Sequence, residues 1–207
     1  WVTISALATA GGTLVLAVAT FSSVRSANRT ARIAEESLLA GMRPLLMQSK
    51  MEDPPLKANF VDGHLVHIPG GNGTAEVGDT AIYLTISLRN AGTGIALLHG
   101  WRAETKQSPG EYTRPPVDSF RRLTRDLYVA SGDVAYWQGA YRELDDAEAT
   151  AVAALIKGRE RIIIDLLYGD QHGRQRVITR FSLQSVSDDG WLAAVGRHWN
   201  VDRPDPR

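Results

Sequence analysis

An uncharged apolar stretch at the start of the chain limits most strongly what this protein can fold into. Residues Trp1 to Val24 (WVTISALATAGGTLVLAVATFSSV) include no acidic or basic side chain. As a helix they would extend about 36 Å, enough to cross a bilayer with a small tilt. Residues 1–24 are therefore predicted to form a transmembrane helix, with the membrane lipid bilayer as its partner. Ala8 and Gly12 have the small-residue spacing that favours close contact between two membrane helices.

Two other interpretations of this stretch are open. Ala17-Val18-Ala19 resembles the cleavage site of a secretory signal peptide, although the uncharged run exceeds the usual apolar length of about 7–15 residues. A helix buried inside a soluble protein would need a larger core than 207 residues supply. An uncleaved anchor is the preferred interpretation.

The charges after the apolar stretch predict its orientation. Arg25, Arg29 and Arg32 follow directly, and the first acidic residues are Glu35 and Glu36. Positive charge beside a membrane helix is retained on the cytoplasmic side. We therefore expect a single-pass protein whose C-terminal domain lies in the cytoplasm. A more basic segment upstream of Trp1 would reverse this orientation.

Residues 25–43 are predicted to continue as a helical stalk. Ala27, Ala31, Ala34 and Leu38 alternate spacings of four and three, which places them on one helical face. Pro44 ends the helix, because the residue before a proline disfavours helical geometry.

Beyond Pro44 the hydrophobic period changes from helical to two, which predicts a β domain over residues 44–200 and a C-terminal tail over 201–207. The clearest strand is 82–89, with aliphatic and polar residues alternating, followed after Asn90–Gly94 by a strand over 95–101. A second pair covers 161–168 and 174–183, and both pairs are predicted to be hairpins or bulged connections. Weaker strand patterns cover 45–50, 65–68, 128–130, 134–141 and 191–195.

One short helix interrupts these strands. Asp145 and Glu148 have the spacing of a capping box, and Gly158 stands where a helix commonly ends. Several short strands with one helix favour a mainly β fold, an antiparallel immunoglobulin-like β-sandwich. A parallel α/β fold would need helices between most strands.

Two motifs support a resemblance. Leu88 to Ala96 (LRNAGTGIA) and Tyr168 to Arg174 (YGDQHGR) resemble recurrent motifs of uncharacterised bacterial membrane-anchored proteins. Those proteins share the order of one N-terminal transmembrane helix, a helical stalk and a small β-sandwich domain. The resemblance implies this layout but no activity and no catalytic residue.

The composition excludes several kinds of chemistry. The chain has no cysteine, which excludes disulfides, thiol nucleophiles and cysteine metal sites. Its 23 basic and 23 acidic residues balance, so no nucleic-acid partner is expected. His64 and His67 would point to opposite faces of a strand, so they are not expected to share a metal ion. Gly70–Gly73 lacks the Lys-Ser/Thr of a phosphate loop and is interpreted as a flexible hairpin loop. No catalytic residue, cofactor or metal site is predicted.

The most unusual segment covers residues 106–125 (KQSPGEYTRPPVDSFRRLTR), which combines prolines, aromatic residues and arginines in a long predicted loop. Aromatic residues and arginine are enriched at protein interfaces. The predicted partner surface comprises Tyr112, Arg114, Phe120, Arg121, Arg122 and Arg125. Alternatively, Phe120 and Leu123 fold onto the core in a short helix, or the arginines meet anionic lipid headgroups.

An anchor and stalk without a catalytic constellation predict a non-enzymatic, membrane-anchored accessory or scaffold subunit. Its β-sandwich would bind a protein partner within a membrane protein complex, or another copy of itself as a homo-oligomer. One alternative is a membrane-tethered sensor that binds a small ligand or sugar on Trp101, Trp137 or Trp191. The other alternative is a hydrolase or metal enzyme.

Overall fold

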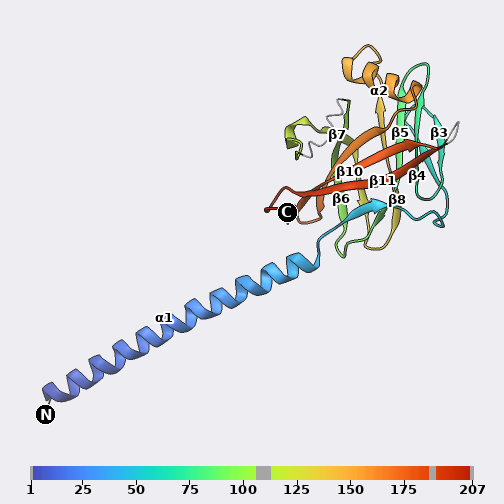
Figure 1. The fold of residues 1–207 in the computed structure, drawn as a ribbon. Coiled ribbons are helices and arrows are strands. Elements are labelled where there is room, and N and C mark those ends of the chain that lie inside the picture. Colours follow the sequence, from blue (N-terminus) through green and yellow to red (C-terminus); the bar gives the residue numbers. More distant parts are fainter. Residues whose placement is uncertain (1, 106–112, 187–189, 206–207) are drawn as a thin grey trace. The chain divides into compact units, whose positions relative to one another are not determined.

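The computed structural model describes residues 2–105, 113–186 and 190–205, with side chains from residue 11 onward except at residue 40. The chain divides into two compact units, Trp1–Gly41 and Met42–Arg207. The first unit is a helix and the second is a β domain (Figure 1).

Helix α1 covers Val2–Gly41 without interruption, so the predicted membrane segment and stalk form one continuous helix. At about 1.5 Å per residue it extends about 60 Å. Its described apolar side chains lie in the open, with Leu14 67%, Leu16 68% and Phe21 70% exposed. Over the part of the chain whose placement is described, no helix is both long enough and apolar enough to span a membrane.

The β domain contains eleven described strands and one α-helix. Its first strands are β1 (Leu46–Gln48), β2 (Leu56–Asn59), β3 (Leu65–Ile68), β4 (Asn72–Val77), β5 (Ile82–Asn90) and β6 (Ala96–Glu104). After the 3-10 turn η1 (Val117–Ser119) come β7 (Arg121–Val129), β8 (Val134–Tyr141), helix α2 (Ala147–Lys157), β9 (Ile162–Asp170), β10 (Arg176–Ser185) and β11 (Trp191–Asn200).

Nine of these described strands form one curled antiparallel sheet. The order is β1-β5-β4-β11-β10-β9-β6-β7, and β8 pairs with the other edge of β5. The two ends of the sheet, β7 and β8, approach each other. Strands β2 and β3 form a separate hairpin that packs Ala58, Phe60 and Ile68 against Tyr83 of β5.

The mainly β, antiparallel class is confirmed, whereas the immunoglobulin-like sandwich is not. A sandwich needs two separate facing sheets. Here β4 pairs with β11 at Gly73–Trp191 and Asn72–Leu192, which joins the strands into one continuous sheet. The interior is filled by large side chains such as Trp137, Tyr168 and Phe181, each fully buried.

Two predicted connections differ from the structure. The β9–β10 hairpin forms as expected, but β5 and β6 do not pair with each other. The predicted flexible loop at Gly70–Gly73 instead leads into strand β4. A side chain at Gly73 would collide with the Thr85 carbonyl, so glycine there allows close strand approach rather than flexibility.

Helix α2 forms where predicted and ends at Gly158 as its C-cap. Its buried residues are Ala149 and Val152. The predicted capping box is wrong, because the N-cap is Asp146 and its side chain makes no capping hydrogen bond. The carboxylates of Asp146 and Glu148 bind Arg121 of β7 instead.

Candidate functional site

The predicted partner surface gathers around the start of β7, and most of it is strand rather than loop. Arg121, Arg122 and Arg125 belong to β7, Phe120 is the C-cap of η1, and Arg114 donates to the Asn200 carbonyl at 2.8 Å. Tyr112 lies outside the described residues. Phe120 packs beside Leu167, Ile178 and Trp199, which agrees with the alternative that it folds onto the core.

Beside this surface, the consecutive strands β7 and β8 do not pair with each other. Residues 130–133 connect the two strands in a tight turn, closed by a hydrogen bond from the Asp133 amide to the Ala130 carbonyl. No backbone ladder joins the two strands along their described lengths. The turn is bonded to β5 instead, because the Asn90 amide donates to the Asp133 carbonyl at 3.1 Å and the Asn90 carbonyl accepts from the Gly132 amide at 2.9 Å. We call the gap between β7 and β8 the open seam.

At the end of the open seam away from the turn, Arg121 of β7 contacts both β8 and the start of α2, and we call it the clamp. Its guanidinium lies 4.6 Å from the centre of the Tyr141 ring on β8 and donates to Asp146 at 3.0 Å and Glu148 at 2.8 Å. The Tyr141 hydroxyl donates to Glu148 at 2.8 Å. Burial, with this hydrogen bond next in importance, raises the pKa of Tyr141 far above its usual range, so the hydroxyl stays protonated. Arg121 therefore closes the seam rather than presenting itself to a partner.

Between turn and clamp the seam holds a cleft of about 240 Å³. Its walls are residues 121–124 of β7, residues 138–140 of β8, Trp101, Arg142, and the Phe60–Val61 tip of the β2–β3 hairpin. The Gln138 Oε1 atom is buried and has no hydrogen-bond partner among the described residues. A buried carbonyl without a donor costs about 1–3 kcal/mol.

Strand β7 is also poorly joined to β6. Its ends pair with β6, at Arg121–Arg122 and at Leu127–Val129, but the register shifts by several residues between them. A hollow of about 540 Å³ lies in this interruption, lined by His99, Asp118, Phe120, Arg122 and Asp126 among others. Burial lowers the pKa of His99, and the nearby positive charge of Arg176 lowers it further.

The two motifs that carried the sequence resemblance meet at a second place, the segment that follows α1. Asn90 Oδ1 accepts hydrogen bonds from the Leu45 amide at 3.1 Å and the Gly92 amide at 3.0 Å. Its Nδ2 donates to the carbonyls of Gly94 and Val129. A side chain at Gly94 would overlap the Met42 carbonyl, so this glycine lets the chain pass. The first motif therefore binds the segment that follows α1 as well as forming a turn.

The second motif holds the same segment from the other side. The buried Tyr168 hydroxyl accepts from the Leu46 amide at 3.0 Å and shares a hydrogen bond with Thr179. Burial raises its pKa to about 12. Asp170 caps the β9–β10 turn by accepting from the amides of Arg174 and Gln175. We call residues 42–46 with these partners the junction socket.

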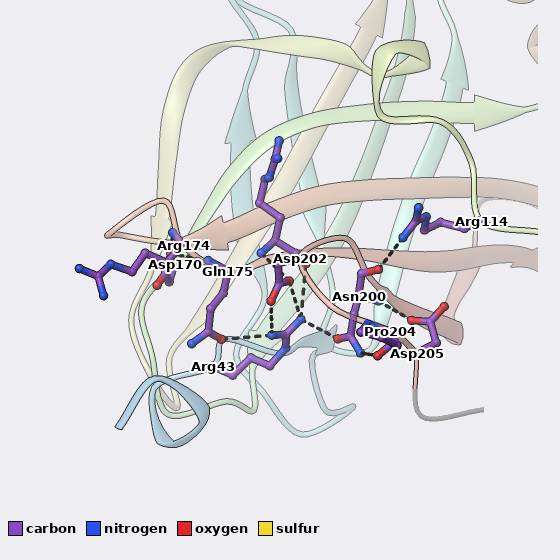
Figure 2. A network of polar contacts seen from close by, with 10 residues as sticks. Arg43, Arg114, Asp170, Arg174, Gln175, Asn200, Asp202, Pro204 and Asp205 are labelled. Atoms are coloured by element: carbon purple, nitrogen blue, oxygen red, sulfur yellow. Dashed lines mark hydrogen bonds and ion pairs between the residues drawn. The ribbon is translucent and has the colours of Figure 1, made fainter. Parts of the chain in front are cut away.

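Arg43 is the central side chain of the junction socket (Figure 2). It donates to both carboxylate oxygens of Asp202 at 3.1 Å, to Asn200 Oδ1 at 2.6 Å and to Gln175 Oε1 at 3.3 Å. Asp202 also accepts from the Arg176 amide at 3.0 Å. The predicted tail thus begins with a structured segment, and Arg43 and Asp202 are functional candidates that sequence reasoning missed. Their 159-residue separation in the chain gave no local signal.

The residues predicted to meet the membrane lie on α1. Arg25, Arg29 and Arg32 are exposed, and their spacing of four and three places them on one helical face. A side chain at Gly12 would meet no described atom beyond the backbone of its own helix. The side chain of Ala8 lies outside the description.

The tryptophans and histidines are the side chains considered for ligand and metal binding, and the structure places them as follows. Trp101, Trp137 and Trp191 are at most 5% exposed, so none offers an open ring for stacking on a sugar. His64 contacts Glu76 at 3.0 Å and stacks on Tyr83. The described residues contain no group of three or more His, Asp or Glu side chains arranged to hold a metal ion.

Neither protein-family models, nor curated proteins, nor solved structures give a match to this chain.

Proposed function

We propose that this protein is a membrane-anchored, non-enzymatic accessory or scaffold subunit. In this proposal α1 crosses the bilayer once with its apolar part, continues as a stalk, and tethers a β domain that binds a protein partner or a second copy. Arg25, Arg29 and Arg32 favour a cytoplasmic position for the domain. The layout is also the one that the two motifs of the resemblance imply.

The observation that carries the proposal is the exposure of large apolar side chains along α1. Leu14, Val15, Leu16, Val18, Phe21 and Val24 are each more than half exposed. Burying a side chain of this size is worth about 1.5–3 kcal/mol, so covering all of them is worth on the order of 10 kcal/mol. They encircle the helix rather than forming one stripe, and a surrounding hydrocarbon phase covers such a helix better than a single protein groove.

Residues 43, 45 and 46 each bond to strands or loops distant in the sequence, so the segment that follows α1 is part of the folded β domain. The β domain itself offers an open seam and exposed arginines, which are features of a binding module.

Membrane fractionation of the full chain tests the anchor. The parent chain is expected to stay in the carbonate-washed pellet, whereas Leu14→Arg/Leu16→Arg/Val18→Arg should release it, because each central arginine opposes insertion by about 2.5–3.5 kcal/mol. The matched control Ser26→Arg/Asn28→Arg/Thr30→Arg adds the same charge at exposed positions of the stalk, outside residues 1–24, and should stay in the pellet. A parent chain that leaves the membrane without detergent refutes the anchor.

The scaffold role and orientation need separate measurements. After extraction in mild detergent, an assembly larger than one chain is expected, and a monodisperse monomer without a bound protein contradicts the scaffold role. Because the chain lacks cysteine, Val61→Cys provides a unique label on a side chain that is 91% exposed. A membrane-impermeant maleimide should label it only after the cells are opened.

A further inference from the structure

A β-bulge in β6 places His99 in the hollow between β6 and β7. The hydrophobic core residues of β6 have even numbers up to Leu98 and odd numbers from Trp101 onward, so one extra residue shifts the alternation. Both neighbouring strands skip His99, since β7 and β9 each pair with Leu98 and then with Gly100. Bulges of this kind commonly redirect a side chain beside a binding site.

Gly169 of β9 makes room for the redirected side chain. A Cβ atom at Gly169 would lie 2.9 Å from His99 Nε2 and 3.4 Å from Arg176 Cγ, so both side chains border the space that the glycine leaves. Burial lowers the pKa of His99 and the positive charge of Arg176 lowers it further, whereas the negative charges of Asp126 and Asp170 act in the opposite direction. The imidazole is therefore neutral near pH 7 and can donate one hydrogen bond and accept another.

Charges of both signs surround this neutral imidazole. The hollow is lined by two arginines, Arg122 and Arg176, and two aspartates, Asp118 and Asp126, so its formal charges balance. All four residues are exposed, and no ion pair to another described residue is found for any of their side chains. Balanced but unpaired charges disfavour a ligand of a single sign and favour a ligand that carries both signs.

Apolar side chains complete the lining of the hollow. Val117, Phe120 and Leu123 are half-buried, and Leu167 behind them is only 6% exposed. The volume of about 540 Å³ falls within the range of about 300–1,000 Å³ that is usual for small-molecule sites. The hollow can therefore hold charged groups and hydrocarbon of the same small molecule.

We propose that this hollow binds a small zwitterion of the amino acid or dipeptide class. The carboxylate of the ligand pairs with Arg176, its ammonium group pairs with Asp126, and its hydrocarbon side chains cover Val117 and Phe120. The neutral His99 ring offers one further hydrogen bond between the two charges. This site goes beyond the proposed function and does not depend on the anchor or on the scaffold role.

Four forms of the dipeptide Leu-Leu test the inference, with binding to the full chain in detergent micelles measured by isothermal titration calorimetry. The free dipeptide carries both charges, its N-acetyl form only the carboxylate, its C-terminal amide only the ammonium group, and the doubly blocked form neither. Because hydrogen bonds to charged groups are the stronger ones, free Leu-Leu should bind at least about tenfold more tightly than either singly blocked form. Partitioning into the micelles would follow the opposite order, since blocking makes the dipeptide more apolar.

Two variants locate the site. Asp126→Asn should reduce the effect of acetylating Leu-Leu to less than about threefold but keep the preference for a free carboxylate. Arg176→Gln should remove the preference for the free carboxylate and keep that for the ammonium group. The matched controls Asp79→Asn and Arg203→Gln make the same charge changes at exposed positions outside the hollow and should bind like the parent.

Several results would overturn the inference. Equal binding of the four forms, no binding of free Leu-Leu at millimolar concentration, or variants that keep both charge preferences would each do so. Circular dichroism checks that the variants fold, and the four forms test the inference on the parent chain without any variant. Membrane fractionation and assembly size are measured separately, so a failure here leaves the proposed function standing.

Discussion

Replacing Arg43 with alanine should weaken the β domain substantially. Arg43 and Asp202 form a two-pronged ion pair, and their side chains are only 15% and 20% exposed. A hydrogen bond to a charged group contributes about 1.5–3 kcal/mol, and the contacts to Asn200 and Gln175 would be lost as well. Because part of the site admits water, we expect Arg43→Ala to lower the free energy of unfolding by about 2–3 kcal/mol.

Urea unfolding of residues 42–207, which form a separate compact unit, is the assay. Trp199 is 2% exposed and adjoins Asn200, so its fluorescence reports on this region. With an m-value of about 2–3 kcal/mol per molar, the midpoint should fall by about 1 M without a change in m. Arg203→Ala removes a neighbouring exposed arginine and should shift stability by less than about 0.5 kcal/mol.

A double-mutant cycle with Asp202→Ala isolates the pair and should give a coupling of about 1–2 kcal/mol. Burial opposes ionisation of Asp202, but hydrogen bonds from Arg43 and the Arg176 amide hold its pKa below 3.8. The coupling should therefore be full above pH 4 and decline as pH falls through the lowered pKa. A coupling under about 0.5 kcal/mol, typical of a solvated surface pair, would refute the reasoning.

Three further predictions concern single residues. Gly94→Ala should destabilise the domain by about 2–4 kcal/mol in urea, because its methyl would overlap the segment that follows α1, whereas Gly196→Ala has ordinary contacts and should change little. Arg180→Met leaves the fully buried Asp165 carboxylate without its 2.7 Å and 2.8 Å hydrogen bonds, and thermal unfolding should show a loss of about 3 kcal/mol; a loss under about 1 kcal/mol would contradict this. Burial lowers the pKa of His198, so the unfolded chain binds protons more readily and stability should fall as pH decreases below about 6.5. His198→Gln should flatten this pH dependence in parallel urea titrations, and an unchanged slope would exclude His198 as its source.

The strand with the clearest alternation, predicted over 82–89, was placed to within one residue of β5. The weaker patterns at 65–68 and 134–141 have the same bounds as β3 and β8. Strand β4 was missed because its Asn-Gly start has the composition of a turn, and only contact with Thr85 explains the glycine. Most of β7 was missed because an exposed edge strand with three arginines has no hydrophobic period.

Pairing was harder to predict than strand position. Asn90–Gly94 has the composition of a hairpin turn, yet its polar groups bind the segment after α1, and β5 and β6 separate. The same limit applies to the candidate sites. Arg121 belongs to an unusual segment, as predicted, but its role as a clamp depends on Glu148 and Tyr141, which only the folded chain brings near.

The arginines of β7 protect an exposed strand edge. An exposed strand edge tends to pair with other chains, and proteins commonly protect such edges with charge and irregular register. Arg122, Arg125 and the shifted β6–β7 register provide this protection here. Substitutions that neutralised these arginines would therefore favour self-association through this edge.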